Sequence, residues 1–356
     1  MKHMKRLKIS TYSAMVALCI PALLFAQQAS GQSTTAVITN TVAHTDTEGN
    51  IMDVHDGNME FFQGKFYLYG TCYGKTDGYT KANRYVCYSS TDLTHWQFQG
   101  DILKDAPDGV YYRPYVKFNP RTKKYVLWYN WYPTLWDGKY GVAVSESPAG
   151  PFVIQNPDVK VTREKPGDLG LFVDDDGTAY LIYTSIKEDH AISIEKLCGD
   201  FLSSTQENSG IIAKGCEACA MFKRNGIYYA LFDRTCCFGP EGSGARVYTA
   251  TAPLGPYTLR GNINRDAGEK PIIAAQQTHI ATIPGPDGVQ RFWMGDVWGS
   301  CKDGIKGHDF QYWSSPLIFD ETGMIKKLVK EDSVTLKLPN PGPEKAPQTG
   351  GDKPSN

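Results

Sequence analysis

The chain has almost no net charge and no long apolar run. Its 37 basic residues nearly balance its 38 acidic ones, so the formal charge is −1 at pH 7. Partners such as nucleic acid or an anionic membrane surface require a basic patch, and this balance argues against both. The apolar run near the start covers residues 14–26 and is shorter than the roughly 18 residues that a membrane-spanning helix needs. The sequence therefore predicts a protein that binds no nucleic acid and does not span a membrane.

The first 31 residues have the order of a cleaved export signal. A basic start, MKHMKRLK, precedes the apolar run, and the small residues ASG follow it. We therefore predict a signal peptide over 1–31 and a secreted protein, periplasmic or extracellular. Removal of its four basic residues would lower the net charge from −1 to −5. A lipoprotein anchor at Cys19 is disfavoured, because the preceding Leu18 is not a small residue.

Cysteines are few, but their number is even once the signal is removed. The eight that remain are Cys72, Cys87, Cys198, Cys216, Cys219, Cys236, Cys237 and Cys301. An even number in an exported chain favours disulfides, so we expect them here. Cys216 and Cys219 have the spacing of a zinc-binding pair, but no second cluster of matching spacing accompanies them. The pairing stays open, and the adjacent Cys236 and Cys237 either form a vicinal disulfide or pair elsewhere.

Helical signals are scarce, whereas turn-forming residues are frequent, with 35 Gly and 21 Pro. Five similar β-hairpin signals recur along the chain. Their central aromatic residues, spaced 58, 55, 48 and 64 residues apart, are Tyr67, Tyr125, Tyr180, Tyr228 and Phe292. Strand-rich repeats of about 50 residues predict an all-β fold, a five-bladed β-propeller.

We assign this propeller to residues 32–338. The tail 339–356, PNPGPEKAPQTGGDKPSN, has almost no apolar residues and is predicted to be disordered. No second folded domain is predicted.

Three acidic residues stand at or just before the first strand of their repeat. Asp56 lies in DVHDGN, Asp168 in PGDLGLF and Glu217 in GCEACAMF. The first strand of every propeller blade faces the central axis, so equivalent positions of different blades converge there. We therefore predict that these three carboxyl groups meet in an axial pocket. As alternatives, Asp56 is only a turn residue before Gly57, or Glu217 is a surface ion-pair partner.

The same segments resemble glycoside hydrolase family 43, whose members are five-bladed propellers. Asp56 lies ten residues before Phe66, as the family's base Asp precedes an aromatic pair. GDLGLFVDDDGTAYLIYTS resembles the family's inner Asp with its D-D-D-G turn, and EACAMFKRNGIYYALF resembles its general-acid motif. The resemblance covers roughly residues 40–335. It implies that Glu217 is the catalytic acid, Asp56 the base and Asp168 a charge that raises the pKa of the acid.

Further segments resemble the exo-β-1,3-galactanase branch of that family. RPYVKFNPRTKKYVLWYN is similar to the branch's R-P-K-V segment, MGDVW to its M-G-D-R-W, and AQQTHI to its S-Q-S-T stretch. The Gln of that stretch has been proposed to help position the attacking water, which implies a catalytic role for Gln276, the better match, with Gln277 close behind. The chain also departs from the pattern. The branch has Gly where Asp56 stands, and Tyr115 stands where the family has a second-blade Asp, so Asp56 and Gln276 are both candidates to serve the water.

Residues within and next to these motifs complete the predicted site. The predicted substrate-binding residues are His55, Arg113, Tyr115, Gln277, Asp296 and Trp298. The chemistry requires no cofactor and no catalytic metal. The resemblance allows a structural Ca²⁺ on the axis, with His55 and His279 as candidate ligands, although each is more often a hydrogen-bonded wall residue. Trp131 and Trp136 are further candidates for sugar stacking, with core packing as the alternative.

The predicted function is a secreted, inverting, exo-acting glycoside hydrolase, a galactan 1,3-β-galactosidase acting on β-1,3-galactan or arabinogalactan. Inversion needs one protonated carboxyl at the leaving oxygen and one carboxylate that deprotonates water on the opposite face of the sugar. One alternative is an α-L-arabinofuranosidase or β-xylosidase on the same scaffold. Another is a catalytically inactive propeller that only binds glycans. The expected partner is an oligo- or polysaccharide, and the protein is expected to be a monomer.

Overall fold

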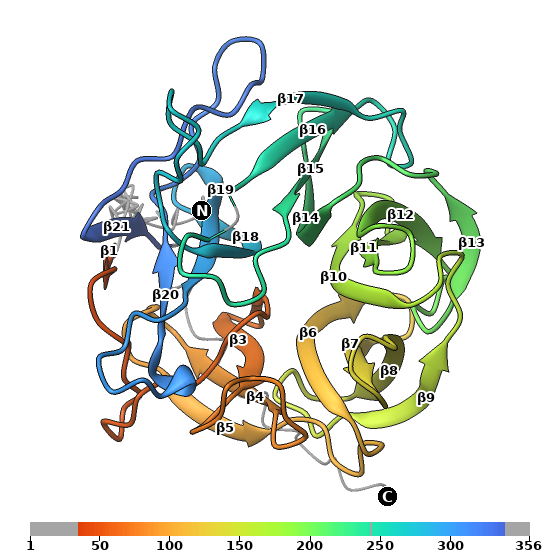
Figure 1. The fold of residues 1–356 in the computed structure, drawn as a ribbon, viewed down its shortest axis with the longest axis horizontal. Helices are drawn as coiled ribbons and strands as arrows, with labels where there is room; N and C mark the ends of the chain where they lie inside the picture. Colours follow the sequence, from red (N-terminus) through yellow and green to blue (C-terminus); the bar gives the residue numbers. More distant parts are fainter. Residues whose placement is uncertain (1–34, 243, 339–356) are drawn as a thin grey trace, which may run out of the picture. The chain divides into compact units, whose positions relative to one another are not determined.

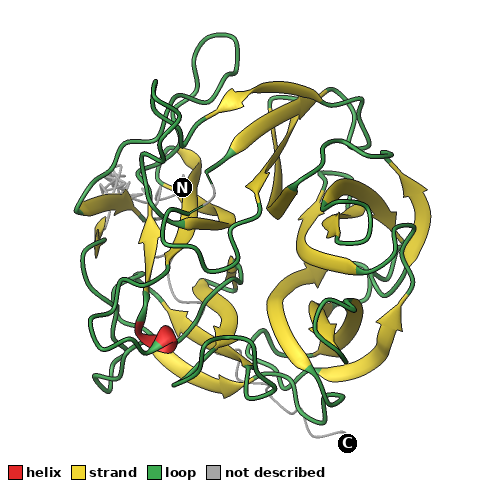
Figure 2. Cartoon of the chain, in the orientation of Figure 1, coloured by secondary structure: helices red, strands yellow, loops and turns green. Residues whose placement is uncertain are grey.

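The computed structural model describes residues 35–242 and 244–338, which consist almost entirely of strands and loops (Figures 1 and 2). Five small antiparallel sheets are arranged in a ring and form a five-bladed β-propeller. The predicted fold class is thereby confirmed. Within the described residues the helical content is one short 3-10 turn, η1 (Lys306–His308). The predicted signal peptide and the predicted disordered tail lie outside the described residues.

Each blade is a meander whose strands follow chain order from the axis outward. Blade 1 contains β2 (Met59–Phe62), β3 (Lys65–Cys72), β4 (Arg84–Ser90) and β5 (Gln97–Asp101). Blade 2 contains β6 (Val110–Asn119), β7 (Lys124–Tyr132), β8 (Lys139–Ser145) and β9 (Val153–Val159). Blade 3 contains β10 (Pro166–Val173), β11 (Ala179–Ser185), β12 (Ala191–Leu197) and β13 (Ser204–Asn208). Blade 4 contains β14 (Cys216–Arg224), β15 (Ile227–Arg234), β16 (Arg246–Ala250) and β17 (Thr258–Asn262). Blade 5 contains β18 (Gln276–Gly285), β19 (Gly288–Val297) and β20 (Phe310–Trp313).

The five aromatic residues that marked the repeats all lie on the second strand of a blade, namely on β3, β7, β11, β15 and β19. Second strands are sandwiched between blades, which explains their near-continuous apolar character. Five apolar clusters result, one between each pair of adjacent blades. Large rings such as Trp128 and Trp293 are fully buried in them, and burial of such a side chain contributes roughly 1.5–3 kcal/mol.

The two ends of the described chain close the ring. β1 (Thr35–Thr39) pairs with β21 (Ser333–Lys337) in an antiparallel two-stranded sheet. The buried side chains of this sheet, such as Ile38 and Leu336, join the apolar cluster between blades 5 and 1. The first and last strands therefore hold together the two blades that the chain itself does not connect in sequence.

Four of the five inner strands break their register near the start of the strand. The interruptions lie between Tyr112 and Tyr115, Pro166 and Leu169, Glu217 and Ala220, and Gln277 and His279. Arg113 and Ala218 have positive φ angles there, and in blade 1 Asp56 has a φ of 55° just before β2. Bulges of this kind turn side chains away from the ordinary alternation of a strand. The irregularity is repeated around the axis, and side chains from the starts of the inner strands converge at that end of the propeller.

All eight cysteines of the described residues are free thiols. The predicted disulfides are therefore not found, and neither is a vicinal bond between Cys236 and Cys237. Several of these cysteines, including Cys87 and Cys219, are packed as small apolar side chains in the clusters between blades. The stability of the ring comes from these clusters and from strand pairing.

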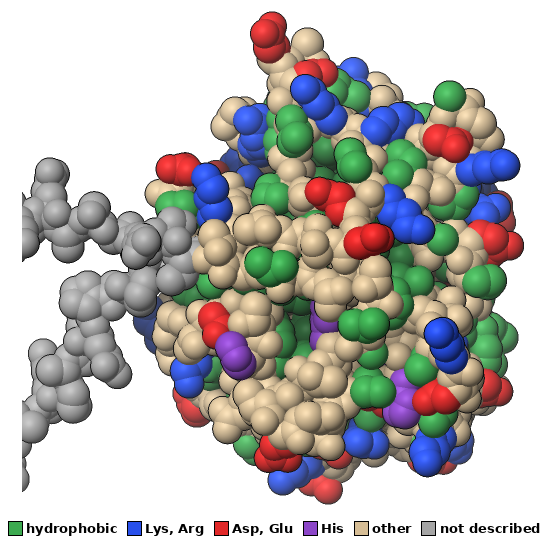
Figure 3. All heavy atoms as spheres, turned by 90° about the vertical axis from the view of Figure 1, so that its left-hand side faces the viewer, with side chains coloured by type: hydrophobic (Ala, Val, Ile, Leu, Met, Phe, Trp, Pro, Cys, Tyr) green, Lys and Arg blue, Asp and Glu red, His purple; other side chains and the backbone are tan. Residues whose placement is uncertain are grey.

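Acidic and basic side chains are interspersed on the face drawn in Figure 3, in agreement with the small net charge. Among the residues that the structure describes, no helix has the length and apolar character to cross a bilayer.

Candidate active site

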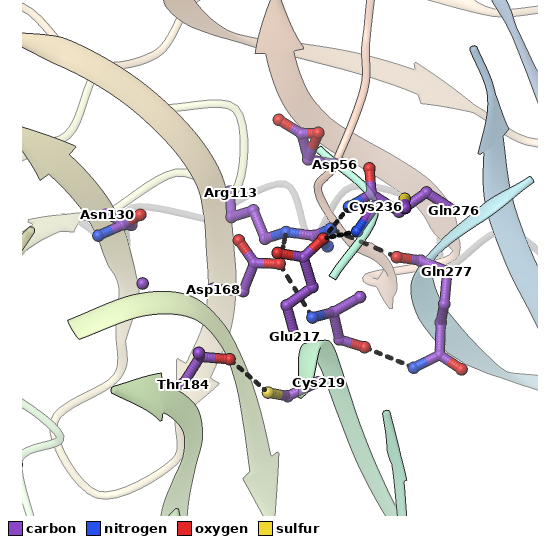
Figure 4. Close-up of polar contacts among 12 residues, drawn as sticks. Asp56, Arg113, Asn130, Asp168, Thr184, Glu217, Cys219, Cys236, Gln276 and Gln277 are labelled. Carbon is purple, nitrogen blue, oxygen red and sulfur yellow. Dashed lines mark hydrogen bonds and ion pairs between the residues drawn. The ribbon is translucent and has the colours of Figure 1, made fainter. Parts of the chain in front are cut away.

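Every blade contributes one side chain from the start of its inner strand to a common pocket. These side chains are Asp56, Arg113, Asp168, Glu217 and Gln276. The pocket has an empty volume of about 550 Å³ and is open to solvent. Figure 4 shows Arg113 and Asp168 beside Glu217, with Asp56 and Gln276 nearby. The predicted convergence of three carboxyl groups is therefore observed, and a guanidinium and an amide join them.

Glu217 is 7% exposed and accepts several hydrogen bonds through one carboxyl oxygen. Its Oε1 accepts from the backbone N–H of Cys236 at 2.9 Å and of Cys237 at 3.4 Å. The side-chain amide of Gln276 donates to the same oxygen at 2.9 Å. Burial first, and then the negative charge of Asp168, raise the pKa of Glu217 to about 7. A large fraction of Glu217 is therefore protonated near neutral pH.

The orientation of the Gln276 amide is fixed by a tryptophan. The indole N–H of Trp298 donates to Gln276 Oε1 at 2.7 Å. Because an indole N–H can only donate, the amide nitrogen of Gln276 must face Glu217. Three N–H donors thus point at Glu217 Oε1, which must act as an acceptor. The proton of neutral Glu217 accordingly belongs on Oε2.

Asp168 is held by an arginine from the neighbouring blade. Arg113 Nε lies 3.0 Å from Asp168 Oδ2, and the backbone N–H of Ala218 donates to the same oxygen at 2.9 Å. Burial disfavours the charged guanidinium, but the carboxylates of Asp168, Asp56 and Glu217 raise the pKa of Arg113 above its usual value. Arg113 is therefore a permanent positive charge among three acids.

Asp56 is 5% exposed and lies between a tyrosine and a second aspartate. The hydroxyl of Tyr73 donates to Asp56 Oδ2, and the backbone N–H of Asp56 donates to Asp296 Oδ2 at 2.8 Å. Burial raises the pKa of Asp56 to about 6, while the charge of Arg113 opposes that rise. At pH 7 Asp56 is therefore mostly ionised, whereas about half of Glu217 is still protonated.

A buried ion pair between His55 and Asp296 lies next to Asp56, whose backbone N–H donates to Asp296. His55 Nδ1 lies 3.2 Å from Asp296 Oδ1. Burial disfavours protonation of His55, yet the hydrogen bond and charge of Asp296 raise the pKa of His55 to about 9. A protonated His55 thus orients Asp296, and Asp296 fixes the backbone of Asp56.

The geometry agrees with the comparison to known protein families. The model for glycosyl hydrolases family 43 matches residues 52–288, which include all five converging side chains. The chain belongs to glycoside hydrolase family 43.

Solved structures of family 43 enzymes resemble this propeller closely. A β-1,3-galactosidase solved with galactodeoxynojirimycin is 26% identical, with a TM-score of 0.71, over 83% of this chain and 99% of that chain. An exo-β-1,3-galactanase from Clostridium thermocellum is 25% identical, with a TM-score of 0.73, over 86% of this chain and 68% of that chain. These likenesses confirm the resemblance to the exo-β-1,3-galactanase branch.

The relatives identified by sequence comparison are named for activities other than that of a β-1,3-galactanase. An arabinoxylan arabinofuranohydrolase from Bacillus subtilis (strain 168) is 26% identical over 300 residues, which is 67% of this chain and 56% of that protein. A β-D-galactofuranosidase from Aspergillus niger is 28% identical over 239 residues, 58% of this chain and 65% of that protein. The chain thus spans less than two thirds of the length of either relative.

Five of the six predicted substrate-binding residues of this family 43 chain do not line the pocket. His55, Tyr115, Gln277, Asp296 and Trp298 are each at most 2% exposed. Their side chains form hydrogen bonds with other residues of the protein instead. The Tyr115 hydroxyl is hydrogen-bonded to His279 Nδ1. The amide nitrogen of Gln277 donates to the carbonyls of Ala218 and Leu231. Of the six predicted substrate-binding residues, Arg113 alone lines the pocket. The contacts of the other five support residues of the site, and a substrate-binding role for them stays a prediction.

Aromatic residues that the motifs did not single out form much of the pocket wall. They are Tyr73, Tyr79, Tyr112, Tyr132 and Phe238. Trp136, one of the stacking candidates, also lines the pocket and is 45% exposed, whereas Trp131 is buried. Most of these residues lie on loops between strands, where the repeat gives no signal of side-chain direction. The backbone donors of Cys236 and Cys237 carry no sequence signal at all, because any residue except proline has an N–H group.

The structural calcium ion on the axis stays a prediction, with His55 and His279 as its candidate ligands. Burial lowers the pKa of His279 to about 3, so this side chain is a neutral imidazole, and its Nδ1 faces the Tyr115 hydroxyl at 2.6 Å. His55 faces Asp296 and Asp53. Calcium takes six to eight oxygen ligands, most of them carboxylates and carbonyls. No group of three His, Cys, Asp or Glu ligand atoms forms around either histidine in the described part of the chain.

Proposed function

We propose that this chain is an exo-acting, inverting galactan 1,3-β-galactosidase that removes terminal galactose from β-1,3-galactan or arabinogalactan. The carrying observation is that two carboxyl groups, Glu217 and Asp56, are buried in one pocket, where their pKa values are raised to about 7 and about 6. Membership of family 43 supports glycoside hydrolysis. The structural relatives that act on β-1,3-linked galactose, which match more than four fifths of this chain, support the substrate.

In the proposed reaction Glu217 is the general acid. Its Oε2 proton goes to the glycosidic oxygen as the bond from that oxygen to the anomeric carbon breaks. Water attacks the anomeric carbon from the opposite face and gives a proton to the carboxylate of Asp56. The products are the shortened glycan and a free sugar of inverted configuration. The next cycle requires only that a proton return from Asp56 to Glu217 through solvent.

Gln276 is assigned a positioning role, because both ends of its amide are already engaged. The amide nitrogen donates to Glu217 and the amide oxygen accepts from Trp298. Asp56 therefore serves the attacking water in this proposal. Arg113 holds Asp168 in place through their ion pair, and the negative charge of Asp168 raises the pKa of Glu217.

A second candidate function is an α-L-arabinofuranosidase. It is favoured by the name of the Bacillus subtilis relative, an arabinoxylan arabinofuranohydrolase. The two functions share the acid and the base and differ in the sugar that the pocket wall accepts. A propeller that only binds glycans is disfavoured, since binding alone gives no reason to bury two carboxyl groups at raised pKa.

Export and a monomeric state are part of the proposal. Polysaccharides do not enter cells intact, so an enzyme that degrades them acts outside the cytoplasm. The basic, apolar and small-residue order of residues 1–31 is typical of an export signal.

The test is incubation of purified protein with β-1,3-galactooligosaccharides, arabinoxylan, arabinan and xylan, with released sugars separated by chromatography. Galactose alone, first seen by NMR as the α-anomer, is the expected result. Arabinose from arabinoxylan would move the chain to the second candidate. Glu217→Gln should lose at least a hundredfold in kcat on the natural glycan and much less on an aryl galactoside, whose leaving group needs little protonation.

A further inference from the structure

A loop next to the pocket contains a compact set of metal-binding side chains. The loop covers residues 299–309, between β19 and β20, and includes the 3-10 turn η1. Asp309, at the end of the loop, accepts hydrogen bonds from the backbone N–H groups of Gly299 and Cys301 at its start, both at 2.9 Å. These bonds hold the two ends of the loop together.

Three different donor groups converge inside this loop. They belong to Cys301, Asp303 and His308, and their ligand atoms all lie within 4.8 Å of one another. His308 Nδ1 is 2.7 Å from Asp303 Oδ2, and the backbone N–H of Ile305 holds the other oxygen of Asp303 at 2.9 Å. Within the described ranges 35–242 and 244–338, this is the one group of three such ligands. None of the three residues takes part in the proposed hydrolysis.

We propose that Cys301, Asp303 and His308 bind one divalent transition-metal ion of the zinc type. Thiolate, imidazole and carboxylate together suit zinc or cobalt, whereas calcium and magnesium prefer oxygen ligands alone. On binding, Cys301 loses its thiol proton to solvent, and the thiolate and carboxylate balance the charge of the ion. The cluster is partly exposed, so water completes a tetrahedral set. His308 Nδ1 and Asp303 Oδ2, now 2.7 Å apart, must separate slightly to bind one tetrahedral ion together, which a loop can accommodate.

The metal would stiffen a loop that touches the wall of the pocket. Lys306, between the ligands, has its ammonium 4.1 Å from the ring centre of Phe238 and 4.6 Å from that of Trp298. Phe238 lines the pocket, and Trp298 donates to Gln276. The site is thus structural, and it is connected to the pocket through the two rings beneath Lys306.

The experiment is a titration of the reduced, untagged, metal-free protein with Co²⁺, followed by absorption spectroscopy. One equivalent should produce the near-ultraviolet band of thiolate-to-cobalt charge transfer, and Zn²⁺ should abolish it by displacement. Cys301→Ser should lose the band, and His308→Ala should weaken Co²⁺ binding at least tenfold. Cys198→Ser, which removes another partly exposed thiol away from the loop, should leave the band unchanged.

Absence of the band in the wild-type protein would overturn the proposal, and so would an unchanged band in Cys301→Ser. Because the spectrum needs no substrate, this result is independent of the sugar that the enzyme cleaves. A second readout guards against misfolded variants: Zn²⁺ should raise the melting temperature of the wild type and of Cys198→Ser but not of Cys301→Ser.

Discussion

At the scale of single residues, the site keeps a carboxyl group where water can hardly solvate it. Glu217 is nearly buried, has Asp168 as a neighbour, and receives its hydrogen bonds on one oxygen only. These contacts favour the protonated form near neutral pH and direct its proton to the other oxygen. A general acid needs both properties, and the folded state gives up stability to provide them.

Glu217→Gln should therefore stabilise the protein at alkaline pH. The pKa of Glu217 is about 7 in the folded state against an ordinary value of 4.5, so its stabilising contribution is lost as pH rises from about 4.5 to 7. Gln keeps an acceptor for the three N–H donors and never ionises. At pH 8 we expect the variant to gain on the order of 2 kcal/mol in the free energy of unfolding, with little gain at pH 4.5.

Urea unfolding at the two pH values measures this difference. Glu321→Gln, at an exposed position, is the matched control and should change stability little at either pH. A Glu217→Gln variant that is less stable than the wild type at pH 8 would show that the ionised carboxylate is favoured in the fold.

At the scale of strands, the site depends on interruptions at the start of the inner strands. Asp56 is followed by Gly57, which packs directly against β3. A Cβ atom at Gly57 would lie 1.8 Å from the backbone oxygen of Tyr69 and 2.8 Å from Gly70 Cα. Both contacts are with backbone, so no side-chain rotation relieves them. The glycine thus lets the segment carrying Asp56 approach blade 1.

Gly57→Ala should cost about 3 kcal/mol or more of unfolding free energy, because it forces two backbone segments apart. Activity should fall further than stability explains, since the displaced residue is the neighbour of Asp56. Thermal melting and kcat at a temperature where the variant is folded measure both effects. Gly268→Ala is the control, because a Cβ there meets nothing nearer than an Asp266 oxygen at 3.4 Å. Equal effects of the two substitutions would contradict this account.

The strands themselves were predictable from sequence, but the details of the pocket were not. The aromatic repeat located the second strand of each blade, and the acids before the first strands correctly indicated a shared pocket. Motif matching placed both Arg113 and Tyr115 at the site, but at the bulge between Tyr112 and Tyr115 only Arg113 enters the pocket. A one- or two-residue shift of this kind follows from three-dimensional packing of adjacent blades. Spacing along the chain does not encode it.

At the scale of the whole molecule, the ring is closed by strand pairing of its two ends. Asn40 follows β1 and bridges to blade 5, where its side chain donates to the carbonyl of Trp313 and accepts from the N–H of Trp313, both at 2.9 Å. It also donates to the carbonyl of Glu331 at 3.1 Å. One amide side chain thus extends the backbone pairing across the closure.

Asn40→Ala should destabilise the propeller by about 2–4 kcal/mol, because it leaves a buried N–H and a buried carbonyl of Trp313 without partners. Guanidinium unfolding followed by tryptophan fluorescence measures the loss. The exposed Thr41→Ala substitution next to it should have an effect below about 0.5 kcal/mol. Similar stabilities of the two variants would show that the closure does not depend on Asn40.

The pH dependence of kcat/KM tests the central claim most directly, that Asp56 is the base and Glu217 the acid of one pocket. The rate should rise as pH increases through about 6, where Asp56 ionises, and fall through about 7, where Glu217 loses its proton. In the residual activity of Asp56→Asn the acidic limb should disappear and the alkaline limb should remain. An acidic limb that persists in Asp56→Asn, or a wild-type rate that stays constant to pH 9, would contradict the assignment.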